Sequence, residues 1–229
     1  MPNHSNCHYY TDSLYSTKVD HLNEKYVSLT IDDFPNINDL NVSIQILDIL
    51  KKYDAHCTFF TIGSHVLKYE ANLIDDLFKR ISVENHELGN HGWRDEMALK
   101  LSKFELEKQI NDTHTVITKN KHFNHKNLWN WFRPGHGYFN STILEVCKKL
   151  NHKLVLGSIY PYDPQLKYSR WNSSFIKYKL YSGAIIILHD RLATVRTLEL
   201  VLPEIIKQNY QIVTLTKLYQ LSKTSLRPD

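Results

Sequence analysis

Residues 26–36 read YVSLTIDDFPN, in which two adjacent aspartates, Asp32 and Asp33, follow six mainly β-forming residues. Tyrosine, valine, threonine and isoleucine favour extended backbone, so residues 26–31 predict a strand. The two carboxylates therefore lie where that strand ends. Catalytic groups of parallel α/β barrels gather at the carboxyl ends of the strands, which makes this pair a candidate site. Taken alone, such a pair is more often the cap of a following helix than a catalytic pair.

Strand and helix patterns alternate along the rest of the chain. Apolar runs predict further strands at 57–62, within 86–91, and at 127–132, 153–159, 184–188 and 211–215. Apolar residues at helical spacing predict helices at 40–50, 65–81, 140–150 and 195–208. Ser102 and Glu105 form a capping box that starts one more helix, and Pro203 should bend the last one.

This alternation amounts to about seven strand–helix units without an internal linker. It predicts the α/β class and a distorted (β/α) barrel of about seven parallel strands, folded as a single domain over residues 25–217. Residues 1–24 and 218–229 lack a strong pattern, so we expect an N-terminal arm and a C-terminal tail.

The composition is that of a globular protein. Of the 229 residues 42% are hydrophobic and 23% charged, and the net charge of +4 comes without a basic run, which argues against a nucleic-acid partner. No segment is apolar enough to span a membrane, and the N-terminus has no basic segment followed by an apolar run. We therefore expect no membrane partner and an intracellular, cytoplasmic location.

Chemically versatile side chains follow several of the predicted strands. His91, Arg133 and His189 each come at or just after a strand end, as do the two aspartates. Each has an ordinary structural interpretation, such as a hydrogen-bonded core histidine or a surface ion pair. Four unrelated strand ends that together supply possible metal ligands, a base and a cation favour one shared site.

These residues resemble the polysaccharide deacetylases with a NodB homology domain, carbohydrate esterase family 4. The resemblance covers about residues 25–217 and rests on five motifs in order, LTIDDFPN, CTFFTIG, HELGNHGWRD, FRPGHGYF and IIILHD, with a looser YPYDP around Asp163. It implies a distorted barrel and metal-dependent removal of N-acetyl groups from N-acetylglucosamine residues of a chitin-like glycan.

The resemblance also implies roles for individual residues. Asp33 and His91 would bind the metal, Asp32 would be the general base and His189 the general acid. Arg133 would keep Asp32 ionised, and Asp163 would orient His189. The expected substrate-binding residues are Phe34, His136, Gly137, Tyr138, Tyr160 and Leu188, of which Leu188 would line the pocket for the acetyl methyl group and the loop at His136 would offer backbone N–H groups to the oxyanion.

Two positions depart from the family pattern. Asp95 stands where most members have a histidine, four residues after His91, which is a helical spacing that would place both side chains on one face. A carboxylate there can still bind a divalent metal. We expect one such ion, zinc before cobalt, manganese or nickel; the alternative is a lost ligand. Phe34 replaces the usual glycine, which is costly if the backbone there needs a positive φ.

The expected activity is deacetylation of an N-acetylated glycan, with the oligomeric state left open. One alternative is hydrolysis of a small intracellular amide or a sugar nucleotide by the same chemistry. Another is a non-catalytic glycan-binding protein that has lost the metal, since 14 tyrosines and 4 tryptophans also suit stacking on sugar rings.

Overall fold

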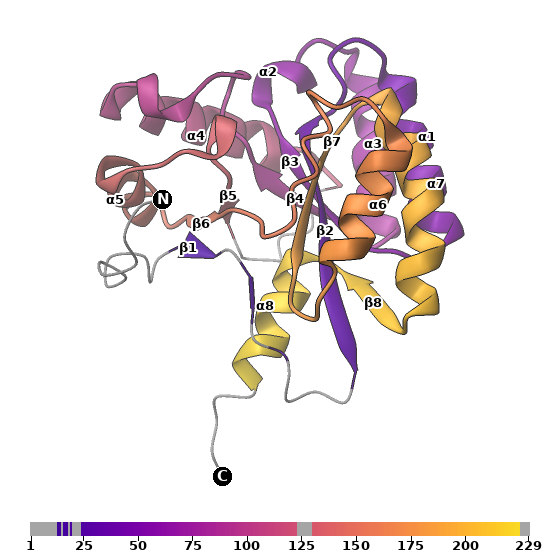
Figure 1. Cartoon of the computed structure of the whole chain (residues 1–229). Helices are drawn as coiled ribbons and strands as arrows, with labels where there is room; N and C mark the ends of the chain where they lie inside the picture. The colour runs from indigo at the N-terminus through magenta and orange to yellow at the C-terminus, as the bar shows by residue number, and fades with distance from the viewer. Residues whose placement is uncertain (1–12, 15, 18, 20–23, 123–129, 225–229) are drawn as a thin grey trace, which may run out of the picture.

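The computed structural model describes residues 13–224 except 15, 18, 20–23 and 123–129. Its centre is a sheet of eight strands in which every pair of neighbouring strands is parallel. The order along the sheet is β1-β6-β5-β4-β3-β2-β7, and β8 pairs with β2 (Figure 1). The strands are β1 Ser13–Leu14, β2 Lys25–Phe34, β3 Cys57–Thr61, β4 Glu87–Asn90, β5 Trp131–Phe132, β6 Lys153–Val155, β7 Ile185–His189 and β8 Tyr210–Val213.

The sheet curls back on itself. Ile159, which follows β6, forms a parallel bridge with Ile186 of β7, and Ser16, which follows β1, forms an antiparallel bridge with Ala184. These bridges bring the β6 end of the sheet toward the β7 end. The predicted α/β class and distorted parallel barrel are confirmed, in the form of a curled half-barrel.

Helices cover the outside of the sheet. Figure 1 shows α1, α3, α6 and α7 grouped beside β2 and β7, with α4 and α5 on the side of β5 and β6. The helices are α1 Leu40–Lys52, α2 Gly63–Val66, α3 Ala71–Val83, α4 Lys103–Thr118, α5 Ser141–Lys149, α6 Ser169–Lys179, α7 Leu192–Lys207 and α8 Leu215–Thr224, with 3₁₀ turns η2 Ala98–Lys100 and η3 Gly135–Gly137. The predicted capping box is confirmed, because Ser102 accepts from the Glu105 N–H and Glu105 accepts from Ser102.

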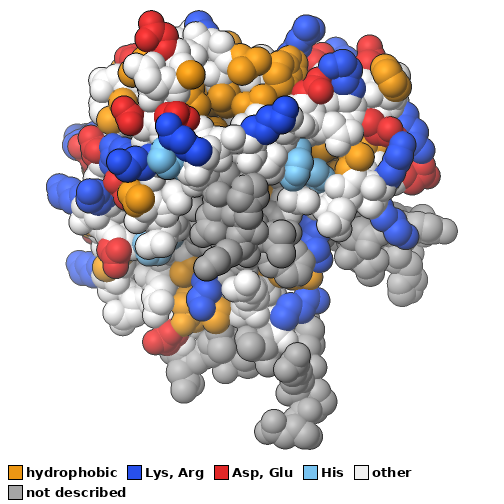
Figure 2. All heavy atoms as spheres, turned by 180° about the vertical axis from the view of Figure 1, so that it is seen from behind, with side chains coloured by type: hydrophobic (Ala, Val, Ile, Leu, Met, Phe, Trp, Pro, Cys, Tyr) orange, Lys and Arg blue, Asp and Glu red, His pale blue; other side chains and the backbone are white. Residues whose placement is uncertain are grey.

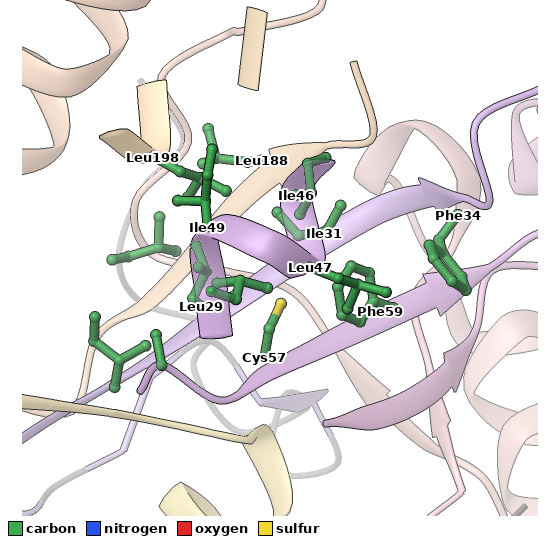
Figure 3. Close-up of a cluster of buried hydrophobic side chains, with 14 of the residues drawn as sticks. Leu29, Ile31, Phe34, Ile46, Leu47, Ile49, Cys57, Phe59, Leu188 and Leu198 are labelled. Atoms are coloured by element: carbon green, nitrogen blue, oxygen red, sulfur yellow. The ribbon is translucent and has the colours of Figure 1, made fainter. Parts of the chain in front are cut away.

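Strand β2 separates the outer core from the barrel interior. Its residues Val27, Leu29 and Ile31 belong to the cluster packed against α1 and α7, together with Phe34 and Leu188 (Figure 3). Side chains alternate between the two faces of a strand, so Thr30 and Asp32 face the other way, into the barrel. This alternation places Asp32 inside the barrel at its mouth, which is the end formed by the carboxyl ends of the strands.

The surface opposite to the view of Figure 1 mixes both signs of charge. Lysine and arginine side chains are interspersed with aspartate and glutamate, and apolar side chains gather along its upper edge (Figure 2). None of the helices in the described part of the chain is both long and apolar enough to cross a membrane.

Several predicted elements differ from those observed. The helix expected at 65–81 is two helices, α2 and α3, and the helix α6 was not predicted at all. The predicted strand 211–215 ends at Val213, because Leu215 already begins α8. Helix α7 begins three residues earlier than expected and continues through Pro203. Residues 127–129 of another predicted strand lie outside the described residues, and β5 covers only its last two positions.

The packed domain extends beyond the boundaries expected at 25 and 217. Strand β1 pairs with β6, and Val19 is completely buried, so part of the expected arm belongs to the barrel. Helix α8 occupies most of the expected tail and buries Leu218. Strand β1 has only two residues, too few for a periodic sequence pattern, and helix α8 lies across the boundary expected at residue 217.

Candidate active site

The register of the central strands brings Asp32 and His189 side by side. They are paired across β2 and β7, and the Asp190 N–H donates to the Asp32 carbonyl at 2.8 Å. Both residues lie at the carboxyl ends of their strands. The site therefore forms at the edge of the sheet where barrel enzymes carry their catalytic groups.

Asp32 forms a buried ion pair with Arg133. The guanidinium Nη1 donates to Asp32 Oδ1 at 2.6 Å and to the Thr30 hydroxyl at 2.7 Å. Arg133 is 1% exposed, and its guanidinium carbon Cζ lies 4.0 Å from the centre of the Phe60 ring. Burial alone would raise the pKa of Asp32, but the charge of Arg133, followed by those of His91 and His189, holds it below its usual value. Asp32 is therefore ionised at neutral pH.

His189 is held by Asp163. The imidazole Nδ1 lies 3.0 Å from Asp163 Oδ1, and the His189 backbone N–H donates to Oδ2 at 2.9 Å. Burial works against the charged imidazole, but the hydrogen bond and charge of Asp163, with the charges of Asp32 and Asp33, raise the His189 pKa above its ordinary value. Asp163 thus contacts both the side chain and the backbone of His189.

Asp33 lies in a constrained turn. Its φ of 62° is in the left-handed region, and its carbonyl accepts from His65 Nδ1 at 3.2 Å. The same His65 nitrogen donates to the Pro35 carbonyl at 3.0 Å. The side chain of Asp33 accepts from Arg191 Nη2 at 2.7 Å through Oδ2. Backbone and carboxylate are thus both held in place.

His91 points its Nε2 at both aspartates. Its Nδ1 lies 2.7 Å from the Arg133 carbonyl, which can only accept, so Nδ1 donates there and Nε2 is the nitrogen left to face other groups. Nε2 lies 3.7 Å from Asp33 Oδ1 and 3.8 Å from Asp32 Oδ2. In the neutral imidazole Nε2 is a metal-binding nitrogen, so His91 Nε2 and Asp33 Oδ1 face each other as two possible ligands of a divalent metal.

Asp95 does not join this group. Residues 91–97 are not helical, so the helical spacing expected between His91 and Asp95 is wrong, and the Asp95 side chain is exposed. Among the described residues no three histidine, cysteine or acidic side chains are arranged to hold a metal ion. The loop is nevertheless packed on the barrel mouth, because a Cβ at Gly135 would lie 2.0 Å from the Glu96 carbonyl oxygen.

Phe34 is a core residue, so its expected place in the substrate groove is wrong. It is fully buried, with its ring centre 4.6 Å from that of Phe59 and 6.5 Å from that of Phe78 (Figure 3). The positive φ in this turn belongs to Asp33, and a cis peptide bond joins Phe34 to Pro35. A phenylalanine is tolerated here because the position does not require the left-handed region.

Leu188 also faces the core, so its expected place in the acetyl pocket is wrong. It is completely buried in the outer cluster, whereas Ile187 and His189 on either side of it are partly exposed. Because side chains alternate along a strand, Ile187 shares the face of His189. Ile187 is the residue of β7 that can line a pocket beside the imidazole.

The other expected substrate residues lie on two loops. His136, with a φ of 64°, and Gly137 are exposed, and Tyr138 is 60% exposed. The Gly137 N–H donates to the Pro134 carbonyl at 3.0 Å, so it cannot bind an oxyanion in this conformation. On the second loop, the ring centre of Tyr160 lies 5.8 Å from that of His189, which places Tyr160 beside the His189 imidazole.

Sequence reasoning missed three residues that support the site. Thr30 contacts Arg133, Asn36 donates to the Asp190 carbonyl at 2.6 Å, and Arg191 contacts Asp33. Thr30 could have been found from strand alternation, since it is two residues before Asp32. The position of Arg191 directly after the IIILHD motif was the available signal for that residue.

The ionised carboxylate of Asp32 and the oriented imidazole of His189 lie at one edge of the sheet, where one can accept and the other donate a proton. Such a pair can act as the general base and general acid of a hydrolase. Residues 20–155 match the family model described as polysaccharide deacetylase, and this chain belongs to that family. The family includes hydrolases that act on N-acetyl amide bonds.

Three relatives are similar over most of this chain. The peptidoglycan-N-acetylmuramic acid deacetylase PdaC of Bacillus subtilis is 34% identical over 205 residues, which are 88% of this chain and 40% of that protein. The solved structure of PdaC has a TM-score of 0.77 at 30% identity and covers 89% of this chain and 94% of the solved one. A peptidoglycan-N-acetylglucosamine deacetylase of Bacillus cereus is 34% identical over 209 residues, 86% of this chain and 89% of that protein.

The third is a family 4 acetyl xylan esterase from Clostridium thermocellum, solved in complex with a cobalt ion. It is 28% identical with a TM-score of 0.74, and the match covers 86% of this chain and 91% of that one. This chain therefore spans less than half of PdaC, most of the Bacillus cereus protein and most of the solved chain of the Clostridium esterase.

Proposed function

We propose that this protein removes acetyl groups from N-acetylated hexosamine residues of a glycan chain, with the help of one divalent metal ion. The observation that carries the proposal is the convergence of the Asp32–Arg133 pair, the His189–Asp163 pair and the Asp33–His91 pair at one edge of the sheet. The names of the relatives favour peptidoglycan strands as the substrate, ahead of the chitin-like glycan suggested by the sequence.

Asp33 and His91 would hold the metal, through Oδ1 and Nε2 respectively. When bound, a divalent ion polarises the amide carbonyl and lowers the pKa of water. Zinc is the ion we expect first, with cobalt, manganese or nickel as substitutes, and the cobalt complex of the Clostridium esterase supports a divalent ion. We propose Asp95 as a further ligand, brought in by adjustment of the loop at its exposed residues 94 and 95.

Asp32 would take the proton from the attacking water. Arg133 occupies Oδ1, which leaves Oδ2, on the side of His91, as the atom that receives the proton. The low pKa of Asp32 keeps it ionised, and the buried Arg133 fixes its orientation.

His189 would protonate the departing amine. Its Nδ1–H is committed to Asp163, so Nε2 is the nitrogen that can deliver a proton to the substrate. The raised pKa of His189 favours the doubly protonated form that this step requires. Ile187 would line the acetyl pocket and Tyr160 would contact the sugar, while backbone N–H groups near Tyr138 would approach the oxyanion.

The test is acetate release from N-acetylated chito-oligosaccharides and from purified peptidoglycan strands. We expect activity that a chelator suppresses and that zinc or cobalt restores, with a loss of at least about a hundredfold in Asp32→Asn, because removing a general base costs about 10² to 10⁴ in rate. The control variant is Asp54→Asn, whose side chain is 99% exposed. Activity that resists the chelator would refute the metal-dependent mechanism.

The same assay separates the alternatives. Acetate release from small amides or sugar nucleotides but not from glycans would favour the small-substrate hydrolase, for which the expected intracellular location is suitable. Glycan binding without acetate release and without bound metal would favour the non-catalytic protein.

A further inference from the structure

Arg191 is a charged residue at the site that has no role in the proposed mechanism. It lies between the end of β7 and the first residue of α7, and its Nη2 donates to Asp33 Oδ2 at 2.7 Å. Its side chain is about one-third exposed, whereas Asp33 is buried. A buried carboxylate is thus held by an arginine from the neighbouring strand end.

The two oxygens of Asp33 have different partners. Oδ2 accepts from Arg191, while Oδ1 lies 3.7 Å from His91 Nε2. The carboxylate is planar, so holding Oδ2 fixes the direction of Oδ1. The turn itself is held by His65, which leaves only the side-chain torsions of Asp33 for Arg191 to set.

Each of the two adjacent carboxylates has its own guanidinium. Arg133 contacts Asp32 at 2.6 Å, and Arg191 contacts Asp33 at 2.7 Å. Without a cation, neighbouring carboxylates repel one another and turn apart. If Asp95 turns inward as a further ligand, its charge adds to this repulsion, and a second arginine beside Asp33 offsets it.

We propose that Arg191 is a positioning residue for the metal ligand Asp33. By holding Oδ2 it keeps Oδ1 directed at His91 and so raises the affinity of the site for a divalent cation. This inference rests on the proposed function. The opposite role would be competition, in which Arg191 takes the place of the cation on Asp33 and lowers the affinity; the geometry favours positioning, because the contact leaves Oδ1 free for the metal.

The two roles predict opposite signs for one measurement. Binding of Co²⁺ to the metal-free full chain is measured by titration calorimetry, with the visible absorption of bound Co²⁺ as a second readout of ligand geometry. Because partners that orient metal ligands contribute about 10- to 100-fold in affinity, Arg191→Ala should weaken Co²⁺ binding by about that factor and change the absorption spectrum. Arg191→Lys should recover part of the affinity, because it keeps the charge but not the planar donor pair.

The matched control is Arg196→Ala on the same helix, where Arg196 forms an exposed pair with Glu199. Its Co²⁺ affinity should equal that of the wild type. Equal or tighter binding in Arg191→Ala would overturn the positioning role, and tighter binding would indicate competition. If Arg191→Ala does not fold, Arg191→Gln takes its place with the same expected direction. A wild-type chain that binds no Co²⁺ would instead overturn the proposed function along with this inference.

Discussion

Replacing Asp163 with asparagine should move the alkaline limit of activity to lower pH. In the wild type Asp163 accepts two hydrogen bonds from His189, at 3.0 Å from Nδ1 and at 2.9 Å from the backbone nitrogen. An asparagine has one oxygen, so its NH₂ group must face one of these donors and a hydrogen bond is lost. The negative charge that favours the protonated imidazole is lost as well.

The size of the change follows from the interaction that is removed. A hydrogen bond to a charged group contributes about 1.5–3 kcal/mol, which corresponds to about one to two pKa units of His189. His189 must be protonated to serve as the acid, and its pKa is raised in the wild type. Asp163→Asn should therefore shift the alkaline limb of the kcat–pH profile to lower pH by about one to two pH units. The acid limb, which reports Asp32, should stay in place.

The raised pKa of His189 also makes the stability of the folded protein depend on pH. The raised pKa of His189 stabilises the folded protein fully below the ordinary histidine pKa, and this contribution is lost as the pH rises through the folded-state value. Urea unfolding should therefore show a larger deficit for Asp163→Asn at pH 6 than at pH 9. Asp54→Asn removes an exposed charge and serves as the control. A fall in kcat with an unmoved alkaline limb would refute the assignment of His189 as the acid that Asp163 tunes.

Four further substitutions test the placement of individual side chains. Arg133→Met should lower the free energy of unfolding by about 3–5 kcal/mol in urea titrations at pH 7, because it leaves Asp32 as an unpaired buried charge; a loss below about 1 kcal/mol would contradict the buried pair. Phe34→Ala should lower the free energy of unfolding by about 3–5 kcal/mol, because it leaves a cavity in the core. The KM of the folded protein should not change; a raised KM would indicate that Phe34 lines the substrate groove after all. Leu188→Ala should destabilise by about 2–5 kcal/mol without raising KM, while Ile187→Ala should raise KM at a smaller cost in stability; the reverse result would contradict the strand alternation.

Much of the fold follows from local sequence signals. The long apolar strands around 26–31, 57–62 and 184–188 and the capping box at 102–105 were predicted because each signal is carried by adjacent residues. Helix α6 was missed, since several polar and aromatic residues on it obscure the apolar spacing. Strand β1 and helix α8 depend on partners distant in the chain, which a local pattern does not show.

The site was predictable where a residue ends a strand and unpredictable where a loop sets the direction of a side chain. Asp32, Arg133 and His189 converge because the register of parallel strands leaves little freedom. Asp95 was placed by an assumed helix that the chain does not form, and Leu188 was placed on the wrong face of its strand. In both cases a motif identifies the residue, but the local backbone decides where its side chain points.

A divalent cation between Asp33 and His91 is the feature on which the proposed mechanism depends most directly. Crystals grown with Co²⁺ can be measured on both sides of the cobalt absorption edge, so that an anomalous difference map identifies the ion. We expect one peak, bonded to Asp33 Oδ1 and His91 Nε2, with Asp95 turned inward as a further ligand and Arg191 still on Asp33 Oδ2. A fully ordered site without an anomalous peak, in a protein that nevertheless releases acetate, would contradict the metal-dependent mechanism.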